Sequence, residues 1–72
     1  MREQVIALIE EILKVPAGTV TETTKAEDLE EWDSLAQVLI IGELERRLGI
    51  SIDLEEAAEL TGVADLFEKA GI

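Results

Sequence analysis

A chain of only 72 residues without a single cysteine cannot stabilise its fold with disulfide bonds or a thiolate metal site. Its hydrophobic fraction of 47%, mostly Ile, Leu, Val and Ala, is nevertheless too high for a disordered acidic tail. A chain of this length allows one domain with a small core. We therefore expect residues 1–72 to form a single domain whose stability comes from packed aliphatic helices.

Helical spacing of apolar residues predicts a first helix over residues 2–15. Pro16 ends this helix, because proline has no N–H for the helical ladder and restricts the residue before it. Residues 17–31 show no clear period and are rich in threonine, which predicts a long loop with Val20 and Leu29 pinned to the core. Connections of this length are uncommon in compact domains and are often functional.

A second helix is predicted over residues 34–48. Asp33 is suited to be its N-cap, with the carboxylate accepting a hydrogen bond from the backbone N–H of Leu35 or Ala36. Gly49 is typical of a left-handed C-cap. The apolar residues of this helix define a stripe one face wide: Leu35, Val38, Ile41, Leu44 and Leu48.

The rest of the chain predicts two more helices. Asp53 and Glu56 have capping-box spacing and would open a short third helix over residues 54–60. A last helix follows over residues 63–69, and its inward residues should be Val63, Leu66 and Phe67. The predicted fold class is therefore all-α: a small four-helix bundle of three longer helices and one short third helix, with a long first loop.

Acidic residues outnumber basic ones by 17 to 6, which gives a net charge of −11. Nucleic acids and anionic membranes are therefore disfavoured as partners, because phosphate groups need clustered Lys and Arg. Basic protein surfaces are favoured, although an acidic surface that only keeps a small domain soluble explains the charge equally well. The apolar runs over 5–9 and 38–41 are far short of a membrane span, and no signal peptide is visible, so we expect a cytoplasmic protein.

The triplet Asp33-Ser34-Leu35 places one hydroxyl at the positive end of a predicted helix. Because the chain has no histidine and no cysteine, Ser34 has no neighbouring base of the usual kind to make it a nucleophile. The first-turn N–H groups and the helix dipole instead favour an attached phosphate. Ser34 is therefore interpreted as a modification site, with simple participation in helix capping as the alternative.

The other residues argue against catalysis and against metal binding. An enzyme of this composition would depend on carboxylates or lysine, and no buried carboxylate pair is apparent. The acidic run over 27–31 lacks the alternating oxygen ligands and the central glycine of a calcium-binding loop. We therefore predict no catalytic residues and no metal site.

Several segments together carry a family resemblance: Trp32-Asp33-Ser34-Leu35, the helix that continues from it to Ile50, and the segments 52–57 and 60–63. With the long first loop, they resemble the acyl carrier protein family over essentially the whole chain. The Asp-Ser-Leu triplet alone is a weak match, but the register of the segments after it makes the resemblance specific. It implies that Ser34 receives 4′-phosphopantetheine from coenzyme A, through a phosphodiester made by a separate phosphopantetheinyl transferase. The thiol of that group would carry acyl groups as thioesters, which accounts for the missing cysteine.

The resemblance also assigns roles beside Ser34, and both Asp33 and Leu35 are predicted as part of the cofactor-binding site. Asp33 caps the helix and, in the family, also helps to hold the transferase's metal ion. Leu35 is expected to face the core and fix the start of the helix, so that Ser34 points outward. Trp32 is expected to pack over the loop, with a position beside the prosthetic arm as the alternative.

The family uses its second helix for recognition, which implies carboxylates that meet basic patches on acyl-loading and acyl-processing enzymes. The residues expected to do so are Glu43, Glu45, Glu55 and Glu56. A merely solvated surface role is the alternative for each of them. Ala36 and Leu39 stand where fatty-acid members commonly have acidic residues, and Gly42 where a bulkier residue is common, which favours a specialised carrier.

We therefore expect a discrete, monomeric acyl carrier protein that is not an enzyme and serves fatty-acid, polyketide or related specialised biosynthesis. Aliphatic chains on its arm could fold back between the helices. A carrier of amino acids or peptides is one alternative, because its fold and tether would be identical. An acidic helical module that binds protein partners without ever being modified is the other.

Overall fold

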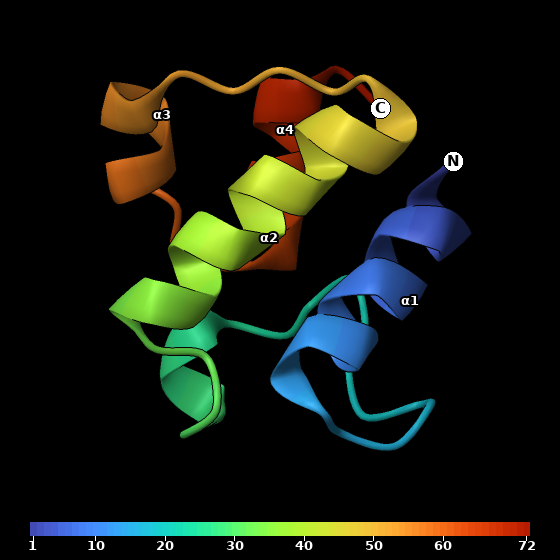
Figure 1. The fold of residues 1–72 in the computed structure, drawn as a ribbon. Coiled ribbons are helices and arrows are strands. Elements are labelled where there is room, and N and C mark those ends of the chain that lie inside the picture. The colour runs from blue at the N-terminus through green and yellow to red at the C-terminus, as the bar shows by residue number, and fades with distance from the viewer.

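The computed structural model describes all 72 residues and contains four α-helices and one short 3-10 helix. In chain order these are α1 (Arg2–Leu13), the 3-10 helix η1 (Ala26–Asp28), α2 (Ser34–Leu48), α3 (Leu54–Ala58) and α4 (Val63–Ala70). Figure 1 shows α2 running across the middle of the molecule, with α1 on one side, α3 on the other and α4 behind it. The prediction of an all-α fold with three longer helices and a short third one is confirmed.

The first helix ends at Leu13, because Lys14 takes a left-handed conformation with φ of 59°. The N–H of Val15 returns to the carbonyl of Glu10 at 3.1 Å and closes the last turn. The sequence prediction had placed the end at Val15, but the residue before Pro16 is kept out of the helical region and the break comes earlier. The buried face of α1 includes the apolar residues Val5, Leu8, Ile9 and Leu13.

A buried carboxylate fastens the loop after α1. Oε2 of Glu10 accepts hydrogen bonds from the backbone N–H groups of Gly18, at 2.8 Å, and Val20, at 3.1 Å. These two donors replace the water that the carboxylate loses on burial. Val20 is buried and Leu29 is partly buried against the same core, so the prediction that both pin the loop is confirmed.

The end of this loop pairs with the link between α3 and α4. Lys25 and Gly62 form an isolated antiparallel bridge, flanked by hydrogen bonds from the N–H of Ala26 to the carbonyl of Thr61 and from the N–H of Val63 to the carbonyl of Thr24. A Cβ on Gly62 would lie 2.6 Å from that Thr24 oxygen. Glycine is needed here because the two backbones approach so closely.

The buried face of α2 differs from the predicted stripe. Ile41 and Leu44 are buried as expected and Leu48 is partly buried, but Leu35 and Val38 are exposed over 68% and 59% of their surface. The apolar run at the start of α2 left its inward face ambiguous, and the small side chain of Ala36 is the one that packs inward. The buried residues of α2 are Ala36, Ile40, Ile41 and Leu44.

The third helix is shorter than predicted, since α3 stops at Ala58 instead of residue 60. Its predicted capping box is wrong, because the side chain of Asp53 caps no backbone N–H. The three residues predicted to face inward from α4 are all buried: Val63, Leu66 and Phe67. The α4 helix runs one residue beyond the prediction, to Ala70, where Gly71 in a left-handed conformation ends it.

Arg2 holds the two ends of the chain together. Its guanidinium binds Oε1 of Glu22 at 2.6 Å and the carbonyl of Ile72 at 2.9 Å, and lies 4.9 Å from the centre of the Phe67 ring. Both termini accordingly lie on the same side of the molecule in Figure 1. None of the helices has the length and the apolar character that crossing a membrane requires.

Candidate functional site

Ser34 is the first residue of α2, and its side chain is exposed. Asp33 is the N-cap, with its Oδ1 accepting the backbone N–H of Ala36 at 2.8 Å. The predicted capping role of Asp33 is therefore confirmed, with Ala36 as the partner. Because capping falls on the neighbouring residue, the Ser34 hydroxyl remains free to be modified.

The start of α2 suits a phosphodiester on Ser34. The helix has 15 residues and no acidic residue in its first turn, so its positive end is not neutralised from within. The carboxylate next to it in the sequence, that of Asp33, is engaged with a backbone N–H. The residues present thus fit an anionic group attached to the serine oxygen.

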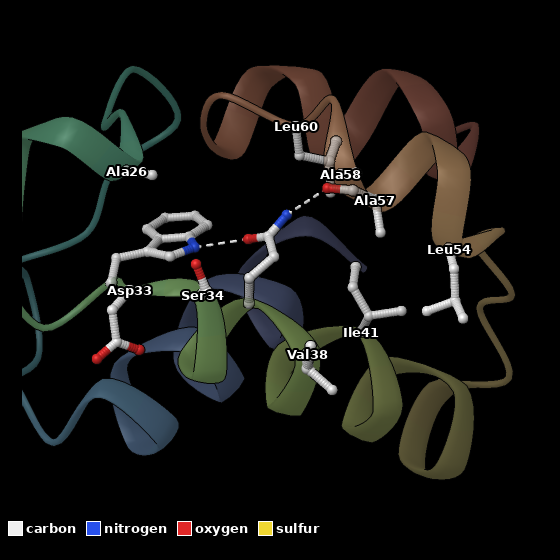
Figure 2. A pocket seen from close by; sticks show the side chains of 11 residues that line it. Ala26, Asp33, Ser34, Val38, Ile41, Leu54, Ala57, Ala58 and Leu60 are labelled. Atoms are coloured by element: carbon white, nitrogen blue, oxygen red, sulfur yellow. Dashed lines mark hydrogen bonds between the residues drawn. The ribbon is translucent and has the colours of Figure 1, made fainter.

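A cleft of about 580 Å³ opens beside Ser34, between α2, α3 and η1 (Figure 2). Most of its walls are apolar, which suits an aliphatic or amide-containing arm better than a charged substrate. Its lining residues include Ser34 itself, Ala26 from η1, Val38 and Ile41 from α2, and Leu54 from α3. The hydroxyl and the cleft are therefore parts of one surface feature.

Gln37 bridges the cleft through both ends of its side-chain amide. Its Oε1 accepts the indole N–H of Trp32 at 2.7 Å, and its Nε2 donates to the carbonyl of Ala57 at 2.7 Å (Figure 2). Sequence reasoning missed this residue, although an isolated glutamine in an otherwise apolar stretch of helix was a usable signal. Trp32 is 6% exposed, so its predicted packing is confirmed, and it lines the cleft as well.

Leu35 does not face the core as predicted, because 68% of its surface is exposed. It lies in the first turn of α2, where the Asp33 cap and the buried Ala36 fix the helix without it. Other large apolar side chains near Ser34 are exposed too, on α2 and on α3: Val38, Leu39 and Leu54. We call these three residues and Leu35 the apolar patch.

The four glutamates predicted to meet partner enzymes are not equivalent. Glu43 binds Arg46 and Arg47 on the same helix, at 2.6 and 2.8 Å, and the hydrogen bond from Arg46 is the main reason why the pKa of Glu43 falls to about 2. Arg47 also forms an ion pair with Glu11 on α1. By contrast, no ion pair occupies the exposed carboxylates of Glu45, Glu55 and Glu56.

An exposed serine at a capped helix N-terminus, beside an apolar cleft in a small helical bundle, is the arrangement expected of a protein that holds an attached group. Residues 3–68 match the family described as "Phosphopantetheine attachment site", and the chain belongs to this family. The solution NMR structure of a holo acyl carrier protein from Geobacter metallireducens is similar, with a TM-score of 0.82 and 26% sequence identity, covering 97% of this chain and 80% of that one. The comparison with curated proteins finds no match.

The family and the structural likeness confirm the expected class of function. The chain is an acyl carrier with a covalently attached phosphopantetheine group, and it works with partner enzymes instead of catalysing a reaction itself. The group supplies the thiol on which acyl groups are held as thioesters. In this chain the start of α2 and the adjoining cleft are the features that fit it.

Proposed function

We propose that Ser34 carries the phosphopantetheine arm and that residues 1–72 form one discrete carrier domain. The exposed hydroxyl of Ser34 at the capped start of α2 is the observation that carries this proposal. In the loading step the serine oxygen forms a bond to the β-phosphorus of coenzyme A and loses its proton. The bond from that phosphorus to the bridging oxygen breaks, and adenosine 3′,5′-bisphosphate leaves.

The residues around Ser34 position the arm. The N-terminus of α2 stabilises the phosphodiester anion through its free N–H groups and its dipole. Asp33 fixes the first turn and so fixes the direction in which the serine oxygen points. Tethering then replaces free diffusion of the acyl group with a high effective concentration at each partner's active site.

Partner enzymes dock on the surface around Ser34, with the apolar patch at the centre of the contact. Exposed apolar side chains clustered beside a functional site are typical of protein interfaces. Leu35 is the member closest to Ser34 in sequence, and it contributes to the site by contacting the enzyme instead of the core. Glu45, Glu55 and Glu56 supply the charge that meets a basic rim, whereas Glu43 already binds two arginines.

The exposed Leu39 favours a specialised carrier over a housekeeping fatty-acid carrier. Fatty-acid members commonly have an acidic residue at this place, and here an apolar side chain is 49% exposed. Acyl-loading and acyl-processing enzymes for this protein should therefore present a more apolar docking surface. We place the carrier, as a monomer, in fatty-acid, polyketide or related specialised biosynthesis in the cytoplasm, where coenzyme A and a phosphopantetheinyl transferase are supplied.

Loading with coenzyme A tests the attachment site directly. The apo protein is incubated with coenzyme A and a phosphopantetheinyl transferase, and intact mass is measured. We expect a single phosphopantetheine adduct on the wild-type protein and none on Ser34→Ala. Ser51→Ala is the matched control, because Ser51 is the only other serine and is also exposed, and it should load like the wild type. An adduct that persists in Ser34→Ala would contradict the proposal.

A further inference from the structure

The side chain of Gln37 lines the same cleft as Ser34 and reaches from α2 to α3. The two residues are three apart on α2, so their side chains share one face of the helix. In Figure 2 the two hydrogen bonds of the Gln37 amide run from the indole of Trp32, near Ser34, to the carbonyl of Ala57 on α3, and Ile41 and Leu54 lie farther along the cleft. The amide therefore ties α2 to α3 within a single cleft whose lining extends from Ser34 to Ile41 and Leu54.

Both polar groups of the Gln37 amide have hydrogen-bond partners, and a hydrocarbon that displaced the amide would leave those partners unpaired. The indole of Trp32 has a single N–H donor, and the Gln37 oxygen is its acceptor. Trp32 is 6% exposed, so moving the glutamine away would leave that donor with little access to water. A methylene chain offers no acceptor in exchange.

The same bridge holds α3 in place. The α3 helix has five residues, makes no side-chain cap hydrogen bond at Asp53, and buries only Ala57. The carbonyl of Ala57 is the group that the Gln37 amide binds, so one side chain joins α2, α3 and the loop end at Trp32. Moving α3 away from α2 therefore requires breaking this contact.

We propose that Gln37 is a specificity-determining residue that keeps α2 and α3 joined, so that long unbranched acyl chains are excluded from the space between them. The cargo of this carrier is accordingly a short acyl group, or one with polar groups that can exchange hydrogen bonds with the Gln37 amide. A long aliphatic chain stays outside the protein and exposed to solvent. This inference rests on the proposed attachment at Ser34 and deepens it, because it names the class of cargo.

Chain-length dependence of thioester reactivity provides the test. Phosphopantetheinyl transferase is supplied with acetyl-, hexanoyl- or decanoyl-coenzyme A, intact mass verifies each adduct, and hydroxylamine cleavage of the thioester is timed. The chain has a single tryptophan, so its indole N–H resonance reports on the bridge without ambiguity. In the wild-type protein we expect the three cleavage rates to agree and the indole resonance to stay in place for all three cargoes.

Two variants remove the bridge in different ways. Gln37→Ala deletes the side chain, and Gln37→Leu keeps most of its size but neither hydrogen-bonding group. Both variants lose two hydrogen bonds, and one alone corresponds to about fivefold, so we expect their decanoyl thioesters to be cleaved at least about fivefold more slowly than in the wild type, with acetyl thioesters unchanged. Gln4→Ala is the matched control, because Gln4 is the only other glutamine and is exposed on α1.

Two results would overturn the inference. One is protection of the decanoyl thioester in the wild-type protein together with a shifted indole resonance, which would mean that the long chain already passes the bridge. The other is equal cleavage of all cargoes in folded Gln37 variants. If the variants fail to fold, the wild-type series decides alone. Failure of the attachment itself is distinguished at the first step, because no adduct mass would form.

Discussion

At the start of α2, one residue caps the helix and the next one has an exposed hydroxyl. The carboxylate of Asp33 binds the backbone N–H of Ala36, and Ser34 is left with an exposed hydroxyl one position later. A serine that capped the helix itself would have its oxygen engaged with the backbone. With the phosphopantetheine arm on Ser34, as proposed above, this division of roles would give the arm a fixed point of attachment whose oxygen is accessible to a transferase.

Replacing Asp33 with alanine should make the protein less stable, whereas replacing Asp53 should have little effect. Asp33→Ala is expected to lower the free energy of unfolding by about 1 kcal/mol, because an orphan N–H of α2 loses its acceptor. Asp53→Ala is the matched control: it also precedes a helix but its side chain caps nothing, so its effect should stay within about 0.5 kcal/mol. Urea denaturation of the three proteins measures both values, and equal losses would contradict the role of Asp33.

Local chemistry explains which residues the sequence could place. Asp33 and Gly49 were predictable, because a cap depends on a few adjacent residues. The pattern could not reveal that Glu10 binds the loop or that Gln37 reaches Ala57, since each contact depends on how distant segments pack. Leu35 was misplaced for the same reason: an apolar run indicates a helix but does not choose its buried face.

At the scale of elements, the long first loop is fastened to the rest of the fold at both of its ends. One end is fastened by Glu10 and the other by the bridge between Lys25 and Gly62. These contacts set the position of η1, whose Ala26 forms one wall of the cleft beside Ser34. The sequence identified the loop and its length, but the fastening depends on close approach to the α3–α4 link and was not visible in it.

A methyl group at Gly62 should disturb this arrangement. Gly62→Ala places a Cβ 2.6 Å from the Thr24 carbonyl oxygen, and the loop backbone has to shift, at an expected cost of about 1–3 kcal/mol in unfolding free energy. Gly42→Ala is the opposite case: no atom lies within 4 Å of its Cβ, and the exposed helical site should gain about 1 kcal/mol. Thermal denaturation measures both effects. A Gly62→Ala variant with the melting temperature of the wild type would show that the loop backbone shifts at little cost.

At the scale of the whole molecule, a net charge of −11 leaves few cations for internal contacts. Arg46 and Arg47 both bind Glu43, and Arg47 also reaches Glu11, so these charges link α2 to α1. Arg2 binds Glu22 and the carbonyl of Ile72 and so links the two termini. The acidic residues of α3 are left without internal partners, which concentrates unpaired negative charge near the cleft and the apolar patch.

This distribution of charge predicts how stability depends on pH. The Arg46 hydrogen bond depresses the pKa of Glu43 from 4.5 to about 2, so the ionised form is favoured in the folded protein. The stabilisation is fully present above pH 4.5 and is lost as the pH falls toward 2. Glu43→Gln should therefore melt at a lower temperature than the wild type at pH 7 in low salt, and the difference should shrink below pH 4.5 and vanish only below about pH 2.

The matched control is Glu45→Gln, which removes the same charge from the same helix but breaks no ion pair. Because it relieves repulsion in a strongly acidic protein, its melting temperature at pH 7 should equal or exceed that of the wild type. In high salt the melting temperatures of both variants should move closer to that of the wild type, since exposed charges are screened. If Glu43→Gln and Glu45→Gln behaved alike across this pH range, Glu43 would act only as one more negative charge, and its contacts with Arg46 and Arg47 would not stabilise α2 in solution.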